Sequence, residues 1–219
     1  MGNLVMFSSI FYDEDIDKSI KEFLPQNSKI GIIPAETRFF KDSPLTESGE
    51  ISEYKEYGYT DFLWFDLGYE YNSALEDKLF ECDAIHLCGG NTFLLLYLLK
   101  KRGFVEKLRK FYNNGGTIIG NSAGSIVMCP DIRIAAFADY NMTRTADYNS
   151  LHLVDFMVKP HWEMWENKIS MFQMFADTCN INIFTLKENQ CIMKTDKYGF
   201  ILFNNPLAIC PQKVEGAKQ

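Results

Sequence analysis

The segment 117–128 constrains the fold most, because its two apolar runs are joined by only six residues. An apolar run at 117–119 precedes Gly-Asn-Ser-Ala-Gly at 120–124, and a second apolar run follows at 126–128. This order predicts a strand, a tight turn with Ser122 at its apex, and a helix, the arrangement known as a nucleophile elbow. A Cβ at either glycine would collide where strand and helix backbones approach each other. A Gly-x-Ser-x-Gly match also occurs in ordinary structural turns, so the function of the serine depends on its surroundings.

Short apolar runs alternate with amphipathic stretches along the rest of the chain. This alternation is typical of an α/β fold, with a mainly parallel sheet covered by helices on both faces. We find no repeat or linker and expect one domain over 1–219. Strands are predicted at 4–9, 29–35, 61–67, 84–88, 153–159, 182–186, 190–195 and 200–204, the last two as a hairpin, and helices at 15–24, 73–80, 93–101, 105–112 and 168–178. A loop leading into a helix is expected at 39–57, and an active-site loop at 131–150.

Composition excludes several classes of function. The net charge of −7 argues against a nucleic-acid or anionic-membrane partner, either of which requires a basic surface. The six cysteines include no Cys-x-x-Cys pair and are expected to be buried free thiols in a reducing compartment. No signal peptide is visible, and the longest apolar stretch, 93–99, is too short to span a bilayer, which together predict a cytoplasmic protein. The 18 Phe, 11 Tyr and 3 Trp exceed what a core requires and are compatible with a homodimer.

A nucleophilic serine needs a base, and the chain has three histidines. His86 lies inside an apolar strand and is interpreted as a core residue. His152 lies in a polar stretch with no distinguishing neighbour. His161 follows Pro160 at the carboxyl end of a predicted strand, the edge where active sites form in such sheets. We therefore predict that His161 is the base, the alternative being a histidine in a surface turn.

Several carboxylates could orient the histidine. Glu188 ends an apolar run and should also lie at the carboxyl end of a strand, so it is the first candidate. Asp139 and Asp131, in the loop after the elbow, are alternatives, and Glu163 is only two residues from His161. Taken alone, each of them is more often a solvated surface carboxylate.

Donors for an oxyanion are expected from two backbone amides. The amide of Ala123 follows the serine directly, and Gly90 lies in Gly-Gly-Asn at 89–91, which ends the neighbouring strand and opens a helix. Asn91 is favoured as the cap of that helix. The reaction of such a serine needs no cofactor, and no Cys/His set has the spacing of a zinc site, so no metal is expected.

Three segments together are similar to one known family. Cys-Gly-Gly-Asn-Thr-Phe at 88–93, Gly-Asn-Ser-Ala-Gly-Ser at 120–125 and Pro-His at 160–161 resemble the peptidase E (α-aspartyl dipeptidase) and cyanophycinase family of serine peptidases. The resemblance implies a flavodoxin-like α/β fold related to class I glutamine amidotransferases. It implies a serine peptidase that acts on short peptides, including dipeptides with N-terminal aspartate.

The resemblance also implies roles for single residues. Ser122 would be the nucleophile, His161 the base and Glu188 the acid, with Gly90 and Ala123 as the oxyanion hole. An aspartate after the elbow has also been considered as the acid in this family, which here indicates the neighbourhood of Asp139.

The chain departs from the family in one segment. Members specific for N-terminal aspartate carry arginines after the Pro-His pair, but 162–168 contains none, and Arg133 and Arg144 are the nearest. Asn91 and Arg133 are therefore the candidates for substrate binding, and a short peptide or amide is the expected substrate. Two other functions stay open, an α/β-hydrolase-like esterase and a non-catalytic binding or regulatory protein on the same scaffold.

Overall fold

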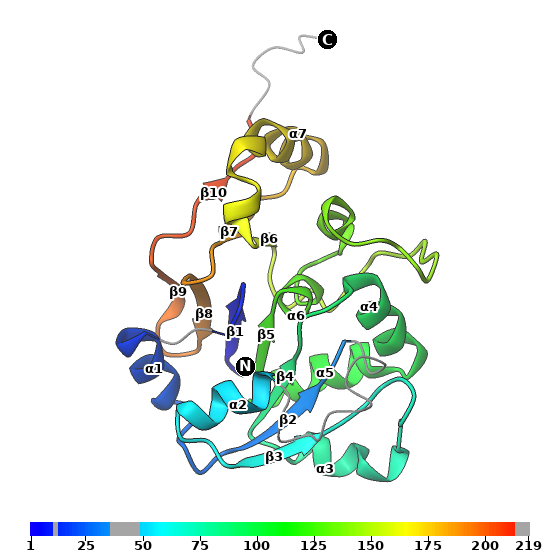
Figure 1. Ribbon diagram of the computed structural model, residues 1–219, viewed down its shortest axis with the longest axis vertical. Helices are drawn as coiled ribbons and strands as arrows, with labels where there is room; N and C mark the ends of the chain where they lie inside the picture. The colour runs from blue at the N-terminus through cyan, green and yellow to red at the C-terminus, as the bar shows by residue number, and fades with distance from the viewer. Residues whose placement is uncertain (11–12, 36–48, 213–219) are drawn as a thin grey trace.

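The computed structural model describes residues 1–10, 13–35 and 49–212. Its main sheet has seven strands in the order β3-β2-β4-β5-β1-β8-β9 (Figure 1). A separate sheet has three strands in the order β10-β7-β6. The strands are β1 (Leu4–Phe7), β2 (Lys29–Ile33), β3 (Asp61–Trp64), β4 (Ala84–Leu87), β5 (Thr117–Asn121), β6 (Met157–Pro160), β7 (Ile183–Leu186), β8 (Cys191–Thr195), β9 (Gly199–Phe203) and β10 (Ala208–Ile209).

The first five strands pair in parallel, and β8 and β9 close one side of the main sheet as an antiparallel hairpin. This confirms the prediction of a mainly parallel α/β sheet. Four of these parallel strands, β1, β2, β4 and β5, are buried on both faces, as their apolar runs predicted, whereas the edge strand β3 is partly exposed. Because β1, β4 and β5 are parallel neighbours, the residues that follow these three strands meet at one edge of the sheet.

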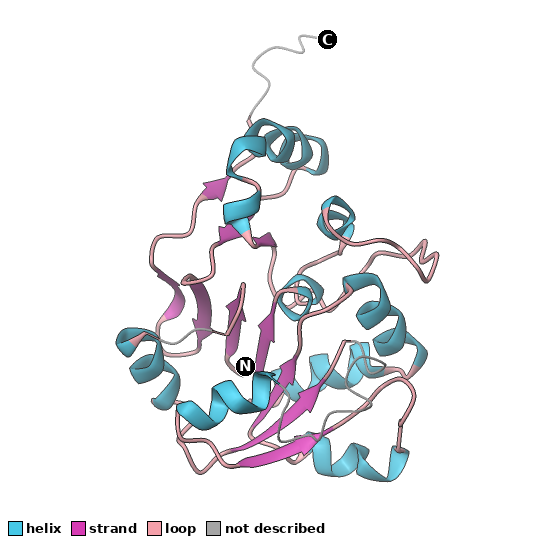
Figure 2. Cartoon of the chain, viewed as in Figure 1, coloured by secondary structure: helices cyan, strands magenta, loops and turns pink. Residues whose placement is uncertain are grey.

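Helices cover both faces of the main sheet (Figure 2). Ile16, Ile20 and Tyr54, from α1 (Glu14–Lys21) and α2 (Gly49–Glu56), pack in one apolar cluster with β1 and β2 residues. The other face is covered by α3 (Glu76–Phe80), α4 (Thr92–Lys101), α5 (Phe104–Asn113) and α6 (Ala123–Val127). The remaining helical segments are η2 (Ser73–Leu75), η3 (Arg133–Phe137), η4 (Trp162–Met164), η5 (Glu166–Lys168) and α7 (Ile169–Cys179).

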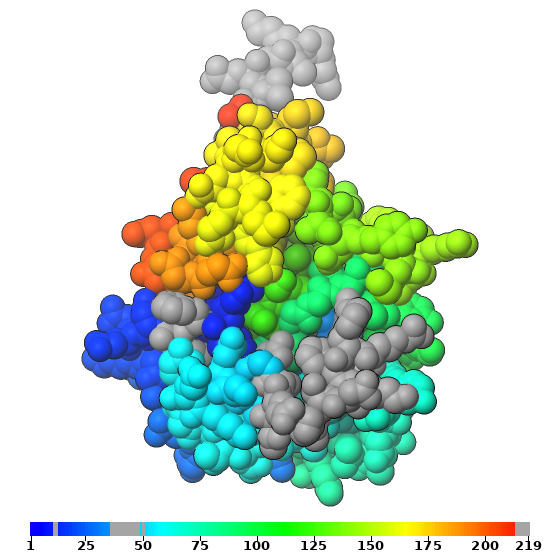
Figure 3. Space-filling view, in the orientation of Figure 1, coloured from blue at the N-terminus to red at the C-terminus, as the bar shows by residue number. Residues whose placement is uncertain are grey.

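The small sheet and α7 lie above the main sheet in Figure 1, and the yellow segment that contains α7 stands at the top of the coloured atoms in Figure 3. The sequence predicted the strands at 182–186 and 153–159 but not that they form a sheet of their own. The strand predicted at 153–159 is also shorter than predicted and begins at Met157, as β6. The amides of Leu151, His152 and Leu153 donate hydrogen bonds to the carbonyls of 127–129 at the end of α6. This stretch therefore packs along the end of α6 before the strand begins.

Other boundaries differ in smaller ways. The helix expected at 73–80 opens with the 3-10 turn η2, and the loop expected at 131–150 contains η3. Within 39–57, where a loop leading into a helix was expected, the helix is α2, and 39–48 lies outside the described residues. All six cysteines are free, but Cys210 is exposed and Cys179 partly exposed, so the prediction that all are buried was wrong for these two. No helix in the described ranges is long and apolar enough to cross a membrane.

Candidate active site

The predicted strand, turn and helix are present around Ser122. β5 ends at Asn121, α6 begins at Ala123, and Ser122 between them has φ 49° and ψ −112°, a conformation that residues other than glycine rarely adopt. A Cβ on Gly120 would lie 2.5 Å from the carbonyl carbon of Gly124, and one on Gly124 would lie 1.8 Å from the carbonyl oxygen of Leu87. The collision predicted from the sequence is thus the reason for both glycines.

His161 lies directly after β6 and reaches across to the elbow. Its Nε2 is 2.9 Å from Ser122 Oγ, and its Nδ1 is 2.7 Å from Glu188 Oε1. Its backbone is in the left-handed region, with φ 56° and ψ 43°. Pro160 ends the strand just before this turn. The structure therefore brings Ser122, His161 and Glu188 into one continuous hydrogen-bonded line.

The Glu188 carboxylate lies in the turn between β7 and β8 and is held by several donors. Partial burial raises the pKa of this carboxyl, but hydrogen bonds from Ser9, His161 and Ser8 lower it more, so the net pKa is below its usual value. The backbone amide of Glu188 also donates to Glu163 Oε1 at 2.8 Å. Glu188 is thus stabilised as the anion that faces the imidazole, and Glu163 holds its backbone.

The two aspartates predicted as alternative acids have different partners. Asp139 Oδ2 accepts a hydrogen bond of 2.8 Å from the amide of Thr92, the first residue of α4. Asp131 Oδ2 accepts hydrogen bonds from the Arg133 guanidinium at 2.7 and 3.1 Å. Neither aspartate shares a hydrogen bond with His161 within the described ranges.

The two remaining histidines lie away from this line. His86 is fully buried, and its ring contacts the Tyr54 hydroxyl and Asn121 Oδ1, both at 2.9 Å. This confirms its interpretation as a core residue. His152 is exposed and pairs with Asp155.

The loop after β4 lies against the elbow. A Cβ on Gly89 would be 3.4 Å from the Ser122 Cβ, which puts 89–90 beside the serine. Gly90 has φ 129°, a value that suits only glycine. The amides of Gly90 and Ala123 donate no hydrogen bond to another residue in the described part of the chain. Two amides without a hydrogen-bond partner among the described residues therefore lie in the segments next to Ser122.

The two residues predicted to bind substrate are engaged by the protein itself. Asn91 Oδ1 caps α4 by accepting from Leu94 N at 3.0 Å, and its Nδ2 donates to the Tyr140 carbonyl at 2.9 Å. This confirms the capping role that the sequence favoured. Arg133 is bound by Asp131, and this pair neutralises the charge that a substrate carboxylate would need.

The sequence did not identify two polar residues near the line. Ser8, at the end of β1, has its Oγ 3.2 Å from His161 Nδ1, and the only available signal was a polar residue directly after a buried strand. Lys159, on β6, has its ammonium 4.5 Å from the centre of the Trp165 ring, and a lone lysine within an apolar strand was its signal.

No group of three His, Cys, Asp or Glu side chains among the described residues could hold a metal ion.

The chain matches one family over most of its length. A sequence model of Peptidase family S51 matches residues 4–201. An uncharacterised peptidase of Pasteurella multocida is 26% identical over 186 residues, which cover 84% of this chain and 85% of that protein. A peptidase E of Nostoc sp. is 31% identical over 102 residues, which cover 44% of this chain and 41% of that protein.

A solved structure resembles the whole chain. A crystal structure of a protein from Listeria monocytogenes EGD-e, named as a candidate peptidase E, superimposes with a TM-score of 0.69 at 25% identity. The match covers 97% of this chain and 100% of the other. Its fold is consistent with the flavodoxin-like α/β fold that the resemblance implied.

Proposed function

Since the chain belongs to peptidase family S51 and is therefore a peptidase, we propose that it cleaves short peptides through an acyl-enzyme formed on Ser122. Membership of this family favours a peptidase over the esterase and the non-catalytic protein that the sequence left open. The observation that carries the proposal is the line from Ser122 Oγ through both nitrogens of His161 to Glu188 Oε1, with steps of 2.9 and 2.7 Å. Both distances are within hydrogen-bonding range, as proton transfer requires.

The proposed reaction uses this line in two steps. His161 Nε2 takes the hydroxyl proton of Ser122 while Oγ bonds to the carbonyl carbon of the substrate. The amides of Gly90 and Ala123 stabilise the oxyanion, and His161 then gives the proton to the nitrogen of the leaving amine as the C–N bond breaks. A water molecule, deprotonated by His161, cleaves the ester and returns Ser122 to its hydroxyl form. Glu188 stays ionised throughout and stabilises the imidazolium.

The substrate class follows from what surrounds the line. The 162–168 segment supplies Lys168 but no arginine, and Arg133 is paired with Asp131. Of the two arginines nearest to this segment, Arg133 is therefore neutralised, and Arg144 is exposed, so these groups offer an acidic N-terminal residue no buried, unpaired guanidinium. We expect short peptides to be cleaved without a strong preference for N-terminal aspartate.

An active-site probe tests the nucleophile. A fluorophosphonate should label the folded wild-type protein, and Ser122→Ala should abolish labelling. Ser150→Ala is the control, because Ser150 is also a buried serine and its Oγ donates to the Val127 carbonyl at 2.6 Å. Absence of labelling in folded wild-type protein, or labelling that persists in Ser122→Ala, would reject Ser122.

A dipeptide library tests the substrate class. Asp-X, Glu-X and neutral N-terminal residues are compared by kcat/KM with the wild-type protein and with Ser122→Ala. We expect turnover that requires Ser122 and varies little with an acidic first residue. A preference of several orders of magnitude for Asp-X would show that another cation recognises the carboxylate.

A further inference from the structure

We propose that Ser8 is a positioning residue that holds His161 and Glu188 in the correct position relative to Ser122. The inference rests on the proposed function of Ser122. It assigns to the end of β1 a role in the reaction that neither its sequence nor the family membership indicates.

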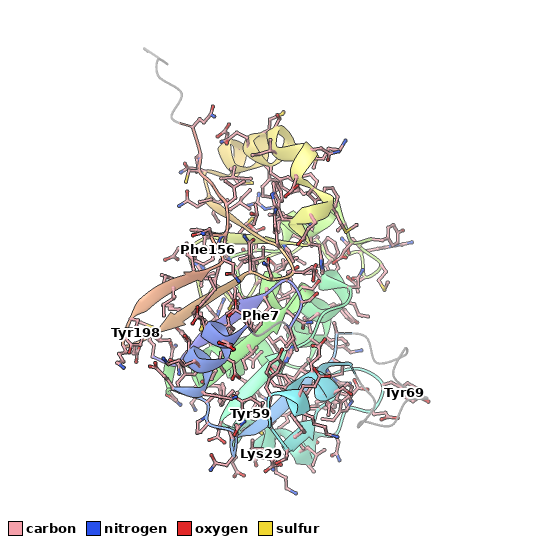
Figure 4. All side chains as sticks on the ribbon, turned by 60° about the vertical axis from the view of Figure 1, so that its left-hand side comes forward. Phe7, Lys29, Tyr59, Tyr69, Phe156 and Tyr198 are labelled. Atoms are coloured by element: carbon pink, nitrogen blue, oxygen red, sulfur yellow. The ribbon has the colours of Figure 1, made fainter. Side chains whose placement is uncertain are left out.

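The end of β1 lies next to the elbow, near the middle of the molecule, where Figure 4 labels Phe7. β1 pairs in parallel with β5, the strand that leads to Ser122. The carbonyl of Phe7 accepts hydrogen bonds from the amide of Ser122 at 3.1 Å and from Ser125 Oγ at 2.8 Å. Phe7 thus fixes the elbow, and Ser8 is the next residue.

The hydroxyl of Ser8 contacts the other two members of the line. The side chain is fully buried, and its Oγ accepts a hydrogen bond from the His161 amide at 2.9 Å and donates one to Glu188 Oε1 at 3.1 Å. Because the hydroxyl has one proton and gives it to Glu188, Nδ1–H of His161 stays directed at the same carboxylate oxygen, 2.7 Å away. Glu188 Oε1 therefore receives two donors from fixed positions.

The bond to the His161 amide has a second consequence. His161 is in the left-handed region, which costs a residue other than glycine free energy unless its surroundings hold it there. The hydrogen bond from its amide to Ser8 Oγ holds this backbone conformation, and the backbone conformation determines where the imidazole points.

The need for such a bridge comes from the architecture. Ser122 follows β5 of the main sheet, whereas His161 and Glu188 follow β6 and β7 of the small sheet. A displacement of about 1 Å between reacting groups can cost on the order of 100-fold in rate. Phe7 and Ser8 are adjacent in the chain. Phe7 hydrogen-bonds the elbow after β5, and Ser8 hydrogen-bonds the two residues that follow β6 and β7, so this pair connects the two sheets at the site.

The test separates positioning from simple stability. Ser8→Ala and Ser8→Thr are compared with wild type and with Ser150→Ala by kcat, KM and the thermal unfolding midpoint, on the best dipeptide of the library. Proton NMR follows the downfield resonance of His161 Nδ1–H, assigned by its loss in His161→Gln. This resonance can be read without turnover, so it tests Ser8 even if Ser122 proves not to be the nucleophile.

We expect Ser8→Ala to lose about 100-fold in kcat with little change in KM and to shift or broaden the downfield resonance. Ser8→Thr, which keeps the hydroxyl, should recover most of kcat. Ser150→Ala should lower the unfolding midpoint and change neither kcat nor the resonance. The inference is overturned if Ser8→Ala keeps the wild-type resonance, or if its kcat falls no more than that of Ser150→Ala.

Discussion

Gly124 shows how closely a single atom is constrained at the elbow. A Cβ there would lie 1.8 Å from the backbone oxygen of Leu87, which cannot move without breaking the β4–β5 pairing. Gly124→Ala must therefore push α6 and Ser122 away from the sheet. We expect a loss of about 1–3 kcal/mol in the free energy of unfolding, measured by denaturant titration, together with loss of fluorophosphonate labelling.

Gly49→Ala is the matched control for this substitution. Gly49 opens α2, and apart from its chain neighbours no atom of the described residues lies within 4 Å of the place where its Cβ would be. Alanine is also the better helix former, so Gly49→Ala should leave labelling intact and keep or slightly raise stability. If the two variants behaved alike, close packing at the elbow would not be the reason for Gly124.

The residues predicted from sequence are those with a local signature. Gly124 and Ser122 lie in one short pattern, and His161 follows a proline at a strand end, so each could be identified from its immediate neighbours. Ser8 could not, because its partner His161 is 153 positions away and only the fold brings them together. A buried serine after a strand has no sequence signature that separates it from an ordinary core serine.

The N-terminus of α4 explains why two carboxylates near the site are expected to differ. Asp139 bonds the Thr92 amide there, and the Asn91 side chain caps the same helix turn. Glu188 instead faces the imidazole of His161. We expect Glu188→Gln to lower kcat by about 10³–10⁴-fold, as loss of the triad carboxylate does elsewhere.

Asp139→Asn should behave differently, because the amide oxygen of asparagine can still accept from Thr92. Its kcat should stay close to that of wild type, and Asp139→Ala should lose about 1 kcal/mol in the free energy of unfolding. Both substitutions are compared by steady-state kinetics and denaturant titration. If Asp139→Asn reduced kcat more than Glu188→Gln, Asp139 would be the acid.

At the scale of the elements, the order of the strands in the two sheets could not be predicted from the sequence. The apolar run at 183–186 is as compatible with the main sheet as with a separate one, because its residues specify burial and not a neighbour. The structure pairs it with β6 and β10. The stretch 151–153 likewise has the composition of a strand, but its backbone amides donate to the carbonyls of 127–129 at the end of α6.

At the scale of the whole molecule, Lys159 is a charge buried inside the small sheet. The side chain is 2% exposed, and its ammonium lies over the Trp165 ring and 6.0 Å from the centre of the Phe172 ring. Burial lowers the pKa of Lys159 to about 8, and the negative charge of Asp139 offsets part of this effect. The usual value for lysine is 10.5, so folding changes how tightly this proton is held.

This difference makes global stability depend on pH in a defined direction. Below pH 8 both the folded and the unfolded chain carry the proton, and the cost of burying the charge is fully present. Between about pH 8 and pH 10.5 the folded chain has lost the proton while the unfolded chain keeps it, so the unfolded state binds more protons and stability rises with pH. The full rise is on the order of 3 kcal/mol.

Lys159→Met isolates this contribution, because methionine fills a similar volume without a charge. We expect the free energy of unfolding of wild type, measured relative to Lys159→Met by denaturant titration at a series of pH values, to increase between pH 8 and pH 10.5. Lys159→Arg keeps its charge over this range and should lack the increase. Parallel curves for wild type and Lys159→Met would mean that the ammonium of Lys159 reaches solvent, and the aromatic rings of α7 and its preceding turn would then not enclose it.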